Sequence, residues 1–169
     1  YDTTQNTIAQ LRNNNAKLEV ANETNKATIK KMGENAKRLN ELTDELNKDL
    51  RLAEVQVFKN YLSGKTGLKN VMFGGDFNFY GSSVSGEPGH DWVLNGGTFP
   101  LFDPIDMTGE WHANSFYANI HTQSTRTTSF DGGATGGLDD RFDFVFVSND
   151  LQTGANKAKY VENSYTAIG

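Results

Sequence analysis

The sequence predicts a mixed α/β (α+β) fold, in which a long helical segment precedes a small domain of strands, short helices and loops. Residues 1–57 contain one aromatic residue and one glycine, whereas residues 58–169 contain the other 18 aromatic residues and 16 glycines. The first region has nine basic and nine acidic residues, so the net charge of −5 belongs to the second. Few aromatics and glycines are typical of helix, and many of both are typical of strands and turns. We therefore expect two regions that meet near residue 57.

Apolar residues in residues 1–57 repeat with the heptad spacing of a coiled coil. Because isolated helices are marginal in water, we expect this stripe to be buried against something. Gly33 is a candidate break, at which the first half would fold back on the second. The alternatives are packing against the rest of the domain, pairing with another chain, or a partly frayed linker. Three polar seam positions, Asn15, Asn22 and Asn25, argue against a simple two-stranded coil. The stripe comprises Leu11, Leu18, Ile29, Met32, Leu39, Leu46 and Leu50.

The second region is expected to contain two strands and two further helical stretches. Residues 52–62 carry a dense apolar face before Ser63-Gly64, which predicts a helix end packed on a sheet. Residues 71–73 are apolar and precede two glycines, and residues 141–148 alternate phenylalanine with other residues, so both are predicted strands. A proline near the start of residues 87–94, with glycines after them, predicts a short helix there.

Composition argues against several classes of protein. The chain has no cysteine, which excludes disulfides and thiolate metal sites. No run approaches the roughly 18 apolar residues that a membrane-spanning helix needs. A net acidic chain is a poor nucleic-acid binder unless a divalent cation reverses the charge locally. The three histidines lie far apart in the sequence and lack the spacing of zinc ligands.

Asp76 and Asn78 are candidate catalytic residues at the end of the first predicted strand. Strand alternation places both on one side and directs Phe77 and Phe79 toward the core. A carboxylate and an amide in this position can hold a water molecule, a metal ion or a phosphate oxygen. The same residues also suit an Asx turn that only ends the strand. Their spacing alone does not separate these two interpretations.

Asp143 is a third candidate, in a predicted strand whose two faces are both largely apolar. A buried carboxylate there is costly unless it is paired or hydrogen-bonded. In one interpretation Arg141, two residues earlier on the same face, is its structural partner. In the other, Asp143 faces a polar functional site at the end of the strand.

His121 and Arg126 are candidate substrate-binding residues in a dense polar run. A guanidinium such as that of Arg126 suits a phosphate group, and His121 would contact the same group. The alternative is a hydrogen-bonded loop in which the histidine is structural. The remaining loop aspartates are expected to be solvated.

Together these segments resemble the endonuclease/exonuclease/phosphatase family, in particular a secreted bacterial branch of it. The resemblance rests on Gly75-Asp76-Phe77-Asn78 and, about 65 residues later, on Arg141-Phe142-Asp143-Phe144. Residues 120–124 and 136–140 add to it, and it covers about residues 51–169.

The resemblance implies part of a β-sandwich flanked by helices and a hydrolase of phosphoesters or phosphodiesters that depends on Mg²⁺ or another divalent cation. It implies that Asp76 orients or activates the attacking water, that Asn78 holds the scissile phosphate, and that Asp143 is a buried carboxylate behind them. A secreted, cell-surface or periplasmic location is implied as well. The phosphate-ester substrate is not specified, and nucleic acid is one option.

The resemblance is also incomplete. The family's metal-binding Asn and Glu lie on early strands and its catalytic His lies in a late Asp-His motif, and this sequence contains neither. We therefore expect an incomplete portion of a catalytic domain, preceded by a helical insertion or arm, with no hydrolase activity on its own. The alternative is a binding or assembly protein that uses the helical arm on a nuclease-like scaffold.

Overall fold

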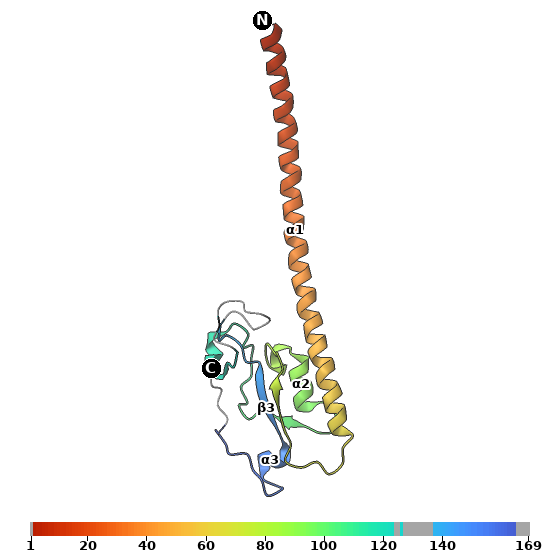
Figure 1. Cartoon of the computed structure of the whole chain (residues 1–169), viewed down its shortest axis with the longest axis vertical. Coiled ribbons are helices and arrows are strands. Elements are labelled where there is room, and N and C mark those ends of the chain that lie inside the picture. Colours follow the sequence, from red (N-terminus) through yellow and green to blue (C-terminus); the bar gives the residue numbers. More distant parts are fainter. Residues whose placement is uncertain (1, 124–125, 127–136, 165–169) are drawn as a thin grey trace. The chain divides into compact units, whose positions relative to one another are not determined.

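The computed structural model describes residues 2–123, 126 and 137–164 of the chain, and Figure 1 shows its elements. It is a mixed α/β structure with two compact units, Tyr1–Glu45 and Leu46–Gly169. One helix, α1 (Asp2–Ser63), contributes residues to both units. The expected boundary near residue 57 lies within this helix. Over the part described, no helix combines the length and apolar character that crossing a membrane requires.

The described residues of the first unit all belong to α1. The helix continues through Gly33, so the predicted break and fold-back at this residue are wrong. A single glycine costs a helix about 1 kcal/mol, which the helix-forming residues on both sides outweigh. The apolar stripe is exposed on this chain, with Ile29 at 69% and Leu39 at 65%. Burial of the stripe against another molecule stays a prediction.

Three strands form one antiparallel sheet in the second unit. They are β1 (Met72–Asp76), β2 (Leu101–Phe102) and β3 (Asp143–Ser148), in the order β1-β3-β2. Both predicted strands are confirmed, although β3 begins at Asp143 and not at residue 141. In the described part of the chain no second sheet accompanies this one, so the implied β-sandwich is not seen.

The core of the second unit is rich in aromatic residues. Phe79, Trp111, Phe144 and Phe146 are fully or almost fully buried. The rings of Phe144 and Phe146 stack with centroids 5.2 Å apart. The last turns of α1 pack on this core through Val55 and Leu62, as the dense apolar face of residues 52–62 predicts.

The remaining elements are short. The helix α2 (Pro88–Asn95) confirms the predicted short helix, with proline in its first turn and Gly96 at its C-cap. Its Val93 lies in the core. The other elements are η1 (Ser83–Ser85), η2 (Ser115–Ile120) and α3 (Asn149–Thr153).

Two buried basic residues fasten the end of α1 to the rest of the unit. The Arg51 guanidinium donates to Glu87 at 2.7 Å. The Lys59 ammonium donates to the carbonyl oxygens of Val93 at 2.7 Å and Phe99 at 2.5 Å. Burial lowers the pKa of Lys59 to about 8. Hydrogen bonding compensates part of the cost of removing these charges from water.

Candidate functional site

Asp76 and Asp143 lie directly opposite each other, where β1 ends and β3 begins. They are register partners in the antiparallel ladder, as are Gly74 and Val145 two residues along. The ladder continues beyond the strands, because the Phe77 N–H donates to the Phe142 carbonyl at 2.8 Å. Both aspartates are exposed. The pairing brings together two candidate residues that are far apart in the sequence. Adjacent antiparallel strands achieve this by placing the end of one strand beside the start of the other.

Asn78 lies beside this pair in a tight turn. Its backbone N–H donates to the Asp76 Oδ1 at 3.1 Å, and its φ is 51°, in the left-handed region that asparagine tolerates. The Asx turn considered from the sequence is therefore present. It does not remove Asp76 or Asn78 from solvent, because both side chains remain exposed. The three candidates Asp76, Asn78 and Asp143 thus share one edge of the sheet.

Thr122 holds the first residue of β3 in place. Its hydroxyl oxygen accepts hydrogen bonds from the backbone N–H groups of Asp143 at 2.8 Å and Phe142 at 3.0 Å. The Thr122 N–H in turn donates to the Asp140 carbonyl at 2.9 Å. Thr122 therefore holds the backbone from Asp140 to Asp143, directly before and at the candidate carboxylate.

The carboxyl group of Asp76 is electrostatically perturbed. Partial burial raises its pKa, the hydrogen bond from the Asn78 N–H acts in the opposite direction, and the charge of Asp143 raises the pKa further. Because Asp76 also remains accessible to water, solvent screening limits these effects. Repulsion between neighbouring carboxylates is the condition that a bound cation relieves.

A small cavity of about 190 Å³ borders Asp76. Its walls come from β1 with the following Phe77, and from the part of α1 that belongs to the second unit. Arg51 and Glu54 supply one charge of each sign to the lining. The cavity gives a small polar group access to the edge of the sheet next to Asp76.

Arg141 does not bind Asp143, so the interpretation in which Arg141 is the structural partner of Asp143 is wrong. It donates instead to Asp103, on the loop after β2, with Nη1 and Nη2 at 2.6 and 2.8 Å from the two carboxylate oxygens. The buried position that the resemblance implies for Asp143 is wrong as well, since this residue is exposed. The cause is local: β3 begins at Asp143, so strand alternation does not extend back to Arg141.

The two candidate substrate-binding residues of the polar run differ in exposure: His121 is buried and Arg126 is exposed. His121 is 2% exposed, and its ring nitrogens lie 3.2 Å from the Trp111 carbonyl and 3.3 Å from the Leu138 carbonyl. This is the hydrogen-bonded structural alternative. Arg126 is exposed, but residues 124–125 and 127–136 on either side lie outside the described residues.

A histidine–aspartate pair near this edge was not predicted. The His112 Nδ1 lies 2.9 and 3.0 Å from the two oxygens of Asp140, whose side chain is buried, and the His112 ring stacks on Tyr80 at 4.2 Å. Burial raises the pKa of Asp140, and the contact with His112 lowers it. An ionised Asp140 accepts from Nδ1–H of His112 and orients the exposed ring. The two residues are separated by 28 positions, so no local spacing signals the pair.

Across the described residues, no three or more His, Asp or Glu side chains form a group that could hold a metal ion. The edge offers two carboxylates and one amide. A Mg²⁺ ion in proteins commonly takes only one or two carboxylates and keeps several water molecules, so this donor set fits Mg²⁺ but would leave most of its ligands to water or substrate.

Comparison with protein-family models found no matching family, and comparisons with curated proteins and with solved structures found no match either.

Proposed function

We propose that the edge formed by Asp76, Asn78 and Asp143 is part of the catalytic centre of a metal-dependent phosphoester hydrolase of the endonuclease/exonuclease/phosphatase type. The observation that carries the proposal is the register of β1 and β3, which sets Asp76 opposite Asp143 with Asn78 beside them. In this proposal the chain supplies an incomplete portion of the catalytic domain.

Each residue has a distinct role in the proposed reaction. Asp76 positions the attacking water through its exposed carboxylate. The exposed amide of Asn78 donates to a phosphate oxygen. Asp143 acts across the ladder on Asp76 through its charge, which is a different role from that of a buried supporting carboxylate.

A divalent cation completes the proposed centre. Asp76 and Asp143 would hold Mg²⁺ together with water and substrate oxygens. When bound, the ion would neutralise phosphate charge and stabilise the charge that develops during hydrolysis. Further metal ligands and the general acid would come from residues beyond those described.

The test is Mg²⁺-dependent hydrolysis of bis(4-nitrophenyl) phosphate and of plasmid DNA. The assay compares the 169-residue chain with the longest natural polypeptide that contains it. We expect no activity from the shorter chain. In the longer one, Asp76→Asn should lower kcat roughly 100-fold or more, which is the usual contribution of a positioned acid or base.

Matched variants separate the site from general charge effects. Asp143→Asn should lower activity in the longer polypeptide, whereas Asp49→Asn, which removes an exposed carboxylate on α1, should leave it unchanged. Full activity of Asp76→Asn would contradict the proposed site. Mg²⁺-stimulated cleavage by the 169-residue chain would contradict the expected incompleteness.

A second candidate is a binding or assembly protein in which α1 is the working part. The observation that favours it is the exposure of the apolar stripe, with Leu18 and Met32 each 65% exposed. Exposed apolar surface of this extent on one helix face is typical of partner-binding helices. Loss of binding to a partner in stripe variants, together with inactivity of the longer polypeptide, would favour this candidate.

A further inference from the structure

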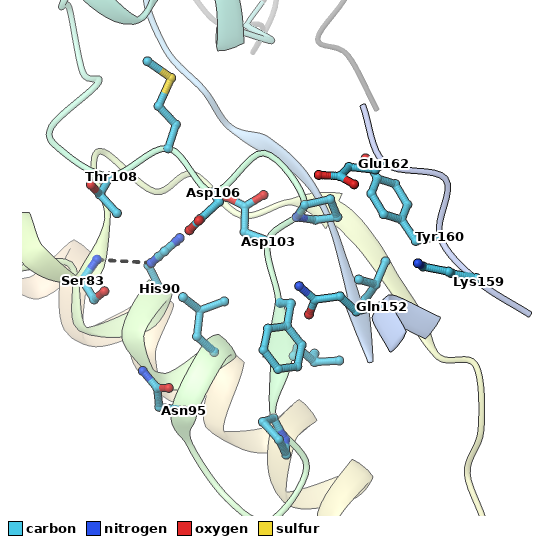
Figure 2. Close-up of a pocket in the computed structure, with 17 residues that line it drawn as sticks. Ser83, His90, Asn95, Asp103, Asp106, Thr108, Gln152, Lys159, Tyr160 and Glu162 are labelled. Atoms are coloured by element: carbon cyan, nitrogen blue, oxygen red, sulfur yellow. Dashed lines mark hydrogen bonds between the residues drawn. The ribbon is translucent and has the colours of Figure 1, made fainter. Parts of the chain in front are cut away.

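A cavity of about 590 Å³, shown in Figure 2, lies in the second unit, and none of the three candidate catalytic residues lines it. Its lining includes Val147, near the end of β3 opposite to Asp143. The other walls come from η1, α2, β2 with the loop that follows it, α3 and residues 159–162. This volume is within the range of pockets that take small organic molecules, roughly 300–1,000 Å³.

His90 contributes a buried hydrogen-bond donor to this pocket. The residue is 3% exposed, and its Nδ1 lies 3.2 Å from the backbone nitrogen of Ser83. Because the Ser83 N–H donates, Nδ1 is the acceptor, and a neutral ring then carries its proton on Nε2. Burial lowers the pKa of His90 to about 4, so the ring is neutral at physiological pH. The Nε2–H group has no hydrogen-bond partner among the described residues.

An unpaired buried N–H group costs free energy, so this donor requires an acceptor that the chain does not provide. In Figure 2 the His90 ring points from α2 toward Asp103 and Asp106. Asp103 is already engaged, because both of its oxygens accept from Arg141. An acceptor atom of a ligand, or a water molecule, would therefore complete the hydrogen bonding of His90.

The charges around the pocket disfavour charged ligands. Asp103 and Arg141 neutralise each other, which leaves the exposed carboxylates of Asp106 and Glu162 against the ammonium of Lys159. An anion would satisfy His90 but would meet two carboxylates. A cation would suit the carboxylates but cannot accept a hydrogen bond from Nε2–H.

A hydroxyl group satisfies both requirements, because it accepts one hydrogen bond and donates another. Several hydroxyl groups on one scaffold could accept from His90 and donate to Asp106 and Glu162. The apolar part of the lining would contact the carbon skeleton of such a ligand. That part consists of Leu94, Pro100, Leu101, Phe102, Met107 and Val147.

We propose that this pocket binds a neutral, hydroxyl-rich small molecule of the sugar class, with His90 as donor and Asp106 and Glu162 as acceptors. The site is independent of the proposed hydrolytic centre, because no residue is shared between them. It assigns a role to a buried histidine that the candidate active site leaves unexplained.

The test is an NMR titration of the ¹⁵N-labelled 169-residue chain, in which the His90 Nε2 resonance is followed. The probes are the methyl glycosides of glucose, galactose and mannose, each compared with its amino-sugar and uronic-acid counterpart. We expect at least one neutral glycoside to shift the resonance with a Kd below about 10 mM, and its uronic-acid counterpart, whose carboxylate meets Asp106 and Glu162, to bind roughly tenfold more weakly.

Variants locate the binding. Asp106→Asn and Glu162→Gln alter exposed side chains and should each weaken binding about tenfold without affecting the fold, since each removes a charge-assisted hydrogen bond. His90→Phe should abolish binding, with thermal melting as the check on folding. The Asp49→Asn chain is the matched control and should bind as the parent does.

Three results would overturn the proposal. If no neutral sugar at about 50 mM shifts the His90 resonance, water alone accepts the hydrogen bond from the His90 Nε2–H group. Tighter binding of an amino sugar or a uronic acid than of the neutral glycoside would show a pocket for charged ligands. Binding that survives both Asp106→Asn and Glu162→Gln would place the sugar elsewhere. None of these results bears on Mg²⁺-dependent hydrolysis, so the two proposals fail separately.

Discussion

Arg141 and Asp103 form a buried ion pair with two parallel hydrogen bonds, at 2.6 and 2.8 Å. The Arg141 side chain is fully buried, and its guanidinium carbon lies 4.1 Å from the centroid of the Phe144 ring. The pair joins the loop after β2 to Arg141, two residues before Asp143 of the candidate site. A buried pair of this kind adds little net stability compared with apolar residues, but removal of one partner leaves an uncompensated charge.

The first prediction concerns this pair. Asp103→Leu and Arg141→Met should each lower the free energy of unfolding by about 3–5 kcal/mol, whereas the double variant should lose much less than their sum. Urea denaturation measures all three. Glu41→Gln, which removes an exposed pair with Lys37 at 3.8 Å, is the control and should change stability by less than about 0.5 kcal/mol. Single variants that lose less than about 1 kcal/mol would contradict the prediction.

The sequence predicted local features better than long-range partners. Helix and strand composition located α1, α2, β1 and β3, because apolar periodicity and glycine or proline positions act locally. The resemblance assigned Asp76 and Asp143 to one site, and the register of the sheet sets them opposite each other. The residue that pairs with Arg141 was not predictable, because Asp103 lies 38 positions away on an irregular loop.

Buried polar residues gave no signal in the sequence. Lys59, His90 and His121 are all buried, although charged and polar residues are mostly exposed and composition gives no sign of their position. Each depends on backbone groups brought close by the tertiary fold, such as the Val93 and Phe99 carbonyls at Lys59. The prediction of a helical break at Gly33 was wrong for the opposite reason, because the helix-forming residues on both sides outweigh the effect of a single glycine.

The second prediction concerns the pH dependence that Lys59 imposes. Its folded pKa of about 8 lies below the ordinary value of 10.5, so between these values the unfolded chain binds the proton more tightly. Stability should therefore rise as the pH increases from about 8 to 10.5, by about 1–3 kcal/mol. The hydrogen bonds from Lys59 to two carbonyl groups favour its ammonium form, which reduces the expected rise in stability toward about 1 kcal/mol.

Denaturation curves at several pH values test this behaviour. Lys59→Met should remove the rise, although it also costs stability at every pH because the Val93 and Phe99 carbonyls lose their donor. The exposed Lys69→Met variant should keep the rise. A parent chain whose stability is flat or falls over this range, after correction with the Lys59→Met curve, would contradict the prediction.

The third prediction tests the coupling across the candidate site. Because the charge of Asp143 contributes to the raised pKa of Asp76, Asp143→Asn should lower that pKa. Carboxyl ¹³C chemical shifts followed through an acid titration measure it directly. Saturating Mg²⁺ should lower the apparent pKa of Asp76 in the parent chain, and by less in Asp143→Asn. Asp106→Asn, at the pocket proposed to bind sugars, should change neither value. If the pKa of Asp76 is the same in Asp143→Asn as in the unsubstituted chain, the two carboxyl groups are not coupled.

The last prediction concerns the first unit and follows from the exposure of its apolar stripe. Most helical stability in proteins comes from packing, so backbone amides in residues 5–45 should exchange with deuterium much faster than those of Val55 and Leu62, which are buried. Gly33→Ala should slow exchange near this position by stabilising the helix by about 1 kcal/mol, because nothing lies within 4 Å of the added carbon. Gly67→Ala is the matched control and should destabilise the chain, because its φ of 75° disfavours alanine.

A partner that covers the apolar stripe should slow exchange in residues 5–45 more than Gly33→Ala does. Slow exchange there in a chain that sedimentation shows to be monomeric would mean that the helix is stable without any partner, and the expectation that its stripe must be buried would then be wrong.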